Sequence, residues 1–230
     1  MREINGILED NGIWVFEQSY MPAMLEQNAY DTICHEHIEY YGLKQIKWMT
    51  DLVGLKIVKI ERNSINGGSF TIVVAKINSS YTEASELVAS ILAEEKHAGL
   101  NTFAPFLEFR NNIFRHRDEL VSLIHNIREN GQSIFGYGAS TKGNVILQFC
   151  NITARDVPYI AEVNRDKFGC VTPGSLIPII SEAEAHAAKP DYFMVLPWHF
   201  RENILVREAS FLRNGGKLLF PLPRLEVVKE

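Results

Sequence analysis

A polar and aromatic segment near the start of the chain has residue types and a spacing that suit acid–base chemistry. Residues 30–41 read Tyr-Asp-Thr-Ile-Cys-His-Glu-His-Ile-Glu-Tyr-Tyr, which places two histidines and two glutamates within five positions. Histidine titrates near neutral pH, and a carboxylate beside it can orient the ring, so the segment is suited to removing a proton. A solvated loop in which charges happen to cluster is the alternative that composition leaves open.

A metal site is a weaker interpretation of the same segment. His35 and His37 are two positions apart, which on a helix directs them to different sides. The spacing also differs from the His-Glu-x-x-His pattern of zinc hydrolases. We therefore expect no metal here.

A glycine turn in the second half of the chain is the other segment that could bind a ligand. Ser133–Asn144 reads Ser-Ile-Phe-Gly-Tyr-Gly-Ala-Ser-Thr-Lys-Gly-Asn. An apolar segment, a glycine turn and a helix-forming segment predict a strand, a tight loop and a helix whose first amides can hold an anion. The spacing matches neither the dinucleotide fingerprint nor a P-loop, in which Ser or Thr follows the lysine. We predict a phosphate-binding loop, and a purely structural turn is the alternative.

The elements around this turn alternate between strand and helix from residue 131 onward, which predicts a parallel sheet with helices on both faces. The strands expected are Ser133–Tyr137, Tyr159–Glu162, Tyr192–Leu196 and Lys217–Pro221. Ligands bind beyond the carboxyl ends of such strands. Three polar strand ends are expected to meet there: Gly136–Ser140, Glu162–Asn164 and Pro197–His199.

The first part of the chain predicts strands with little helix to cover them. Ile13–Phe16 is continuously apolar, which favours a strand buried on both faces. A helix over 42–52, stopped by Gly54, precedes two further strands, 56–60 and 69–75, joined by the Asn66-Gly67-Gly68 turn. Residues 79–130 predict amphipathic helices. We expect three parts: 1–78, 79–130 and 131–230.

Composition limits the possible partners. A formal net charge of -5 argues against a protein that tracks phosphates with a basic face, so we expect no nucleic-acid partner. Three scattered cysteines indicate a reducing compartment rather than a disulfide framework. The sequence has neither an apolar run of about 18 residues nor the apolar core of a signal peptide. We expect a soluble cytoplasmic protein without a membrane partner.

Several segments together resemble the sugar C-methyltransferase family, in one register over nearly the whole chain. Members of that family use S-adenosylmethionine to methylate a carbon of a nucleotide-linked deoxy sugar. They have an N-terminal zinc module, a Rossmann-like methyltransferase domain and a C-terminal Rossmann-like domain that helps to hold the sugar nucleotide. The segments that carry the resemblance are Trp14–Tyr20, Tyr30–His37, Asn66–Ser69, Gly136–Asn144, Thr172–Gly174 with Ile177-Pro178, and Pro190–Tyr192 with Leu196–Trp198.

The resemblance implies an α/β fold in which a partial methyltransferase sheet and a helical connector precede a Rossmann-like C-terminal domain with a parallel sheet. The family's zinc cysteines, cofactor glycine loop and acidic ribose ligand would all lie upstream of Met1. We therefore expect that the chain alone does not bind S-adenosylmethionine tightly. A complementing N-terminal chain or a homodimer is the expected partner.

The resemblance also assigns roles to residues. It makes His37 the base, Glu36 its helper or a sugar-hydroxyl ligand, and Tyr40 a less certain neighbour. Cys34 and His199 stand where relatives often have tyrosine and asparagine, so the identity of the sugar does not carry over. The residues expected to bind the nucleotide sugar are Gly136, Gly138, Ala139, Ser140, Lys142, Gly143, Asn144, Glu162, Asn164, Lys167, Trp198 and His199.

The resemblance implies part of a C-methyltransferase that recognises a nucleotide sugar, and two other functions remain open. The chain could be a non-catalytic module that binds a nucleotide sugar through its C-terminal part. A dehydrogenase that uses a nicotinamide cofactor at Gly136–Gly138 is the weakest alternative, because the loop spacing is wrong.

Overall fold

The computed structural model describes residues 1–64 and 67–230, which form two compact units. Unit 1 comprises residues 1–26 and 38–109, and unit 2 comprises residues 27–37 and 110–230. The units do not follow the order of the chain, because 27–37 belongs with the C-terminal residues. Asn66, at the predicted glycine turn, lies outside the described residues.

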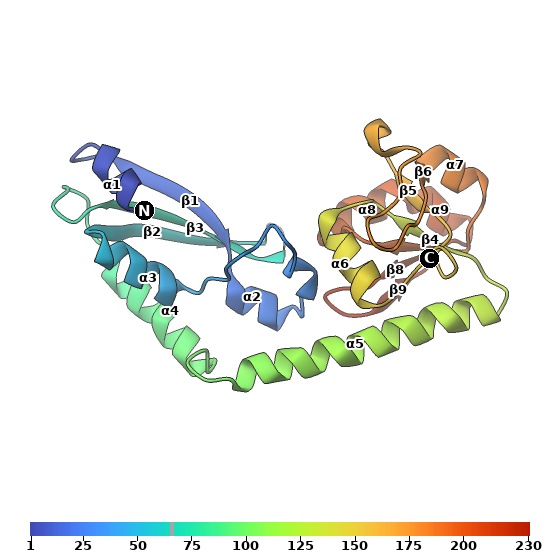
Figure 1. Cartoon of the computed structure of the whole chain (residues 1–230), viewed down its shortest axis with the longest axis horizontal. Coiled ribbons are helices and arrows are strands. Elements are labelled where there is room, and N and C mark those ends of the chain that lie inside the picture. Colours follow the sequence, from blue (N-terminus) through green and yellow to red (C-terminus); the bar gives the residue numbers. More distant parts are fainter. Residues whose placement is uncertain (65–66) are drawn as a thin grey trace. The chain divides into compact units, whose positions relative to one another are not determined.

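Unit 1 is a three-stranded antiparallel sheet with helices packed on it (Figure 1). β3 lies between β1 and β2, so the predicted hairpin is confirmed as the pair β2 and β3. The helix predicted before it is also confirmed, and Gly54 follows that helix with a φ of +73°. The elements are α1 (Arg2–Ile7), β1 (Ile13–Ser19), α2 (Met21–Glu26), α3 (Leu43–Leu52), β2 (Leu55–Asn63), β3 (Ser69–Lys76) and α4 (Ser85–His97).

The prediction that the first strand is buried on both faces is wrong. Ile13 and Val15 are 46% and 53% exposed, whereas the alternate residues Trp14 and Phe16 pack against the core. β1 is an edge strand of an antiparallel sheet, and such sheets commonly bury one face only. The apolar run therefore leaves one apolar stripe in solvent.

The helical segment after the sheet of unit 1 consists of α4 and the longer α5 (Ala104–Glu129), which belongs to unit 2 from Arg110 onward. Leu120, Ile124 and Ile127 form the buried side of α5 in unit 2. Among the described residues, no helix combines the length and the apolar character needed to cross a bilayer.

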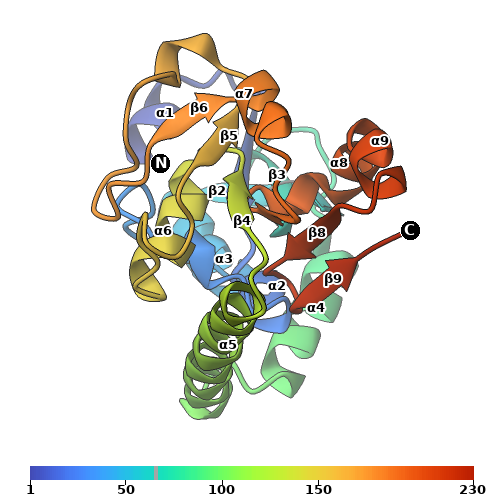
Figure 2. The same cartoon turned by 90° about the vertical axis from the view of Figure 1, so that its right-hand side faces the viewer.

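Unit 2 is a six-stranded sheet in the order β6-β5-β4-β7-β8-β9. Figure 2 shows β6, β5 and β4 toward one side of this sheet and β8 and β9 toward the other. All neighbours pair in parallel except β8 and β9, which confirms the predicted Rossmann-like α/β fold. β6 and β9 were not predicted. The elements are β4 (Ile134–Tyr137), α6 (Thr141–Phe149), β5 (Ile160–Glu162), β6 (Ile179–Ser181), α7 (Glu182–Ala187), β7 (Tyr192–Val195), α8 (Arg201–Arg207), α9 (Ala209–Arg213), β8 (Lys217–Phe220) and β9 (Glu226–Val228).

The strand order defines where a ligand can enter unit 2. From β4 the chain passes to β5 and β6 on one side, and then returns to β7 and β8 on the other. In open parallel sheets, ligands bind outside the carboxyl ends of the strands at such a reversal. The turns that follow β4, β5 and β7 therefore form the candidate site.

Candidate functional site

The turn between β4 and α6 has close backbone packing that requires glycine. Gly138 has a φ of +83°, and a Cβ atom there would lie 2.7 Å from the ring of Pro197. A Cβ atom at Gly143 would lie 2.8 Å from Leu196. Ser140 caps α6, because its Oγ accepts a hydrogen bond from the Gly143 amide at 3.0 Å. The predicted strand, turn and helix are thus present, and the turn after β4 packs against the residues that follow β7.

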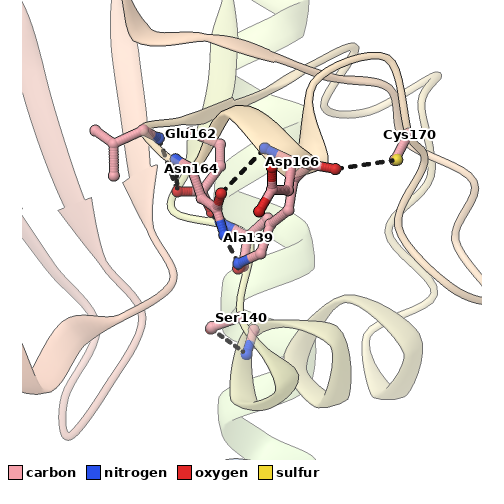
Figure 3. Close-up of polar contacts among 9 residues, drawn as sticks. Ala139, Ser140, Glu162, Asn164, Asp166 and Cys170 are labelled. Atoms are coloured by element: carbon pink, nitrogen blue, oxygen red, sulfur yellow. Dashed lines mark hydrogen bonds and ion pairs between the residues drawn. The ribbon is translucent and has the colours of Figure 1, made fainter.

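A glutamate at the end of β5 holds this turn (Figure 3). The Glu162 carboxylate accepts hydrogen bonds from the amides of Ala139 at 3.0 Å, Val163 at 2.7 Å and Asn164 at 3.0 Å. Lys167 Nζ donates to the Ala139 carbonyl at 2.7 Å and lies 3.3 Å from the carboxylate. Burial alone would raise the pKa of Glu162, but the Asn164 and Val163 amides and the Lys167 ammonium hold it below its usual value. The structure therefore brings four of the predicted site residues into one network.

A cavity of about 350 Å³ opens beside the same turn. Its walls come from Gly138–Ser140, from the strand end at Glu162 and Val163, and from α8 with its preceding turn. The α8 side supplies Phe200 and the polar side chain of Asn203. Apolar walls with a few polar groups are typical of small-molecule sites.

A larger cavity of about 790 Å³ lies at the other end of the sheet, beside the residues that precede β7 and β8. It is lined by Lys189–Asp191, Gly215 and Gly216, among others. Parallel sheets bind ligands at their carboxyl ends, so we assign the candidate site to the smaller cavity.

The acid–base segment belongs to unit 2 as far as His37. Thr141, the first residue of α6, donates a hydrogen bond from Oγ1 to Glu36 Oε1 at 3.3 Å. Glu36 is exposed and His37 is half-buried. Tyr40 belongs to unit 1, so its role beside His37 stays a prediction.

Asp31 is the buried member of the segment, and sequence reasoning did not single it out. Its side chain is fully buried and accepts a hydrogen bond from Trp198 Nε1 at 2.7 Å. Burial raises the pKa of Asp31, while Trp198 and the nearby Lys142 oppose that shift. An aspartate in a polar loop gives no signal of burial in the sequence, because its partner lies 167 positions away.

The Lys142 side chain lies near Asp31 and Cys34. Burial lowers the pKa of Lys142, and these two groups act against that shift. Burial and the Lys142 charge lower the pKa of His199 to about 4, so its imidazole is neutral at pH 7. Lys142 and His199, both predicted as ligand-binding residues, therefore lie close to the acid–base segment rather than apart from it.

The remaining predicted residues occupy less accessible positions. Gly136 is a buried residue of β4, and Trp198 is only 5% exposed. Asn144 is half-buried in the first turn of α6, where its amide bonds to the Ser140 carbonyl. In the part of the chain that the structure describes, no three His, Cys, Asp or Glu side chains form a group that could hold a metal ion.

Comparison with known proteins connects this architecture to methyl transfer. Residues 64–223 match the family described as the C-methyltransferase C-terminal domain. The chain is also 31% identical over 225 residues to the C-methyltransferase NovU of Streptomyces niveus. That alignment covers 98% of this chain and 53% of NovU, so the chain spans about half the length of this relative. The chain belongs to the C-methyltransferase C-terminal domain family.

Proposed function

We propose that the chain acts in C-methylation of a keto sugar linked to a nucleoside diphosphate, with unit 2 holding the sugar nucleotide. The observation that carries the proposal is the hydrogen bond from Thr141 to Glu36. It joins the start of α6, where backbone amides favour an anion, to the segment best suited to remove a proton. A phosphorylated substrate held at α6 would then have its reacting end near Glu36 and His37.

The diphosphate is assigned to the turn and the first residues of α6. Ser140 and Thr141 lie at the start of α6, where a helix N-terminus favours an anion, and Lys142 supplies a positive charge. The adjoining cavity of about 350 Å³ has the apolar walls that a nucleobase requires. Glu162, Asn164 and Lys167 would hold the turn in the shape that fits the phosphates.

The chemistry assigned to this chain is removal of a proton from the carbon beside the ketone. His37 would take that proton on its imidazole, and the electrons of the broken C–H bond would move to the carbonyl oxygen to give an enolate. Glu36 would stabilise the imidazolium that forms. The enolate carbon is the nucleophile that C-methylation needs.

The methyl donor implied by the family is S-adenosylmethionine, and the described residues of unit 1 do not fit it. In that unit no glycine turn joins a strand to the helix that follows: Gly54 precedes β2, and Gly67 and Gly68 lie between β2 and β3. We therefore assign no donor contact to this chain. The donor site is proposed to come from residues outside this sequence, in a missing N-terminal segment or in a complementing chain.

Calorimetry on the full chain tests the proposal. We expect a keto-sugar nucleoside diphosphate to bind with a micromolar Kd, about -8 kcal/mol, and nicotinamide dinucleotides not to bind. Binding without any proton exchange at carbon would favour the non-catalytic binding module, which the cavity and turn of unit 2 also support. Absence of nucleotide binding would refute both.

A further inference from the structure

We propose that Asp31 and Trp198 are positioning residues whose buried hydrogen bond fixes the Glu36–His37 segment to unit 2. The acid–base pair and the turn at α6 would then move as one body. The catalytic consequence rests on the function proposed above, whereas the anchoring itself does not.

The hydrogen bond between Asp31 and Trp198 is buried, so breaking it costs free energy for both residues. Asp31 is fully buried and Trp198 is 5% exposed, so neither group can turn to water in the folded state. The indole N–H is a donor only, and at 2.7 Å it makes a short bond to a carboxylate. Loss of the indole N–H would leave a buried carboxylate without this donor, which is costly in a protein interior.

The contact joins the segment to the site itself. Trp198 begins the 3-10 turn Trp198–Phe200, which directly follows β7 and leads into α8. Pro197 in the same connection packs against Gly138 in the turn before α6. The anchor therefore attaches the segment to the strand ends where the ligand is expected.

Tyr30 provides a second anchor beside the first. Its hydroxyl lies 3.2 Å from His116 Nδ1 in α5 and 3.6 Å from Cys150 Sγ, and its ring packs on Phe149. Burial lowers the pKa of His116, which favours its neutral ring. Nε2 of that ring can donate to the Pro221 carbonyl, which leaves Nδ1 to accept a hydrogen bond from the Tyr30 hydroxyl. Phe149 and Cys150 end α6, whereas Thr141, which bonds Glu36, begins it. The segment thus runs along α6 from its last turn to its first.

This arrangement explains how a short polar loop can hold a base in place. Residues 33–37 contain no regular helix or strand, so their position depends on the contacts before and after them. Tyr30 and Asp31 fix the start of the loop, and the exposed bond from Thr141 guides its end. A general base must lie within hydrogen-bond reach of the proton it removes, so loosening the start should reduce turnover more than affinity.

Amide hydrogen exchange of residues 28–37 in the full chain, read by mass spectrometry, tests the anchor without any ligand. We expect Trp198→Phe to speed exchange in this segment by about tenfold or more, and Asp31→Ala to do the same. The double variant should show little further change, because the two single changes remove the same contact. Glu208→Gln is the matched control: Glu208 is also buried in unit 2, but it accepts its bond from Tyr137 and not from the segment.

Solvent deuterium exchange into a keto-sugar nucleotide supplies the catalytic readout. Trp198→Phe should lower kcat for carbon exchange by about tenfold, with KM changed less than about threefold. Asp31→Asn keeps an oxygen that can accept from the indole N–H, so it should lower kcat less than Asp31→Ala does. If Trp198→Phe fails to fold, Asp31→Asn and Asp31→Ala carry the comparison. Unchanged amide exchange in every variant, or fully additive effects in the double variant, would overturn the anchor. Failure of the wild type to bind nucleotide would instead refute the proposed function. The amide hydrogen exchange of residues 28–37 would still decide whether Asp31 and Trp198 anchor the segment.

Discussion

The Glu162 carboxylate accepts a hydrogen bond from the Ala139 amide at 3.0 Å, which ties the end of β5 to the turn after β4. In dinucleotide-binding folds an acidic residue near this place binds a ribose hydroxyl. Here both carboxylate oxygens already accept hydrogen bonds from the protein. These contacts favour a role for Glu162 in holding the turn, and they count against the dehydrogenase alternative.

Replacing this carboxylate should loosen the turn. Glu162→Gln keeps the shape of the side chain but puts an NH₂ group where an oxygen now accepts a hydrogen bond. We expect the free energy of unfolding in urea to fall by about 1–3 kcal/mol, the usual cost of an unpaired buried polar group. Glu202→Gln, at an 86% exposed carboxylate, is the control and should change it little. Equal stabilities of the two variants would contradict the assigned role.

The difference in stability between wild type and Glu162→Gln should depend on pH. The pKa of Glu162 is below its usual value in the folded protein, so its ionised form stabilises the fold. That contribution is complete above the unfolded pKa, about 4.3, and it disappears as the pH falls through the lower folded pKa. Urea titrations at neutral pH and at successively lower pH should therefore show the gap between wild type and Glu162→Gln closing only on the acid side. A gap independent of pH would show that charge is not the cause.

The sequence was sufficient for the sheet of unit 2 but not for all its members. Alternating apolar segments and turns predicted the parallel strands β4, β5, β7 and β8. β6 and β9 were missed although the equally short β5 was predicted. β6 runs directly into α7, and β9 is an antiparallel edge strand outside the alternation of strand and helix. In unit 1, the apolar run at Ile13–Phe16 looked buried on both faces, since sequence does not show that β1 lies at a sheet edge.

The candidate site shows the same limit more clearly. Residue types selected the segment 30–41 and the turn before α6 as separate features, and the family resemblance then singled out Glu36 and His37 within that segment. Their meeting in unit 2 depends on side-chain contacts such as Asp31 with Trp198, between residues far apart in the chain. Such contacts produce no periodic pattern or fixed spacing in the sequence. The three-dimensional structure was therefore needed before the two motifs could be treated as one site.

Lys142 is predicted to bind the diphosphate. Lys142→Ala should raise the Kd for a nucleoside diphosphate sugar by roughly 10–100-fold, the loss of one charge-assisted hydrogen bond of about 1.5–3 kcal/mol. It should also flatten the salt dependence of binding, because one ionic contact is removed. Lys189→Ala, at an exposed lysine at the opposite end of the sheet, should change neither property. If Lys142→Ala behaves like the control, the turn at α6 is structural only.

The exposed apolar stripe of β1 predicts association. Ile13 and Val15 are about half exposed on a strand for which β3 is the only neighbour among the described residues, and such edges favour pairing with another chain. We expect sedimentation to show a dimer or larger species, and Val15→Lys to shift it toward monomer. Val206→Lys, on the 80% exposed Val206 of α8, is the control for added charge alone. A wild type that stays monomeric at all accessible concentrations would contradict this prediction.

His37 is predicted to be the base. Proton removal beside a ketone needs no methyl donor, so solvent deuterium exchange at that carbon isolates the step assigned to this chain. Wild type should exchange a keto-sugar nucleotide, and His37→Ala should slow exchange by about 10²-fold or more, the usual contribution of a positioned base. His35→Ala is the matched control, because this exposed histidine lies two positions away in the same segment.

The same exchange experiment on Glu36→Gln distinguishes two possible roles of Glu36, as the helper of the base or as a ligand of the sugar. Glu36→Gln should lower kcat for exchange if Glu36 stabilises the imidazolium, and it should raise KM instead if Glu36 binds a sugar hydroxyl. Its hydrogen bond from Thr141 is exposed and survives in the glutamine variant, so the segment should keep its position. Equal exchange rates in wild type and His37→Ala would remove His37 from the mechanism. Exchange in neither, with nucleotide binding intact, would instead mark unit 2 as a binding module that needs another chain for the chemistry.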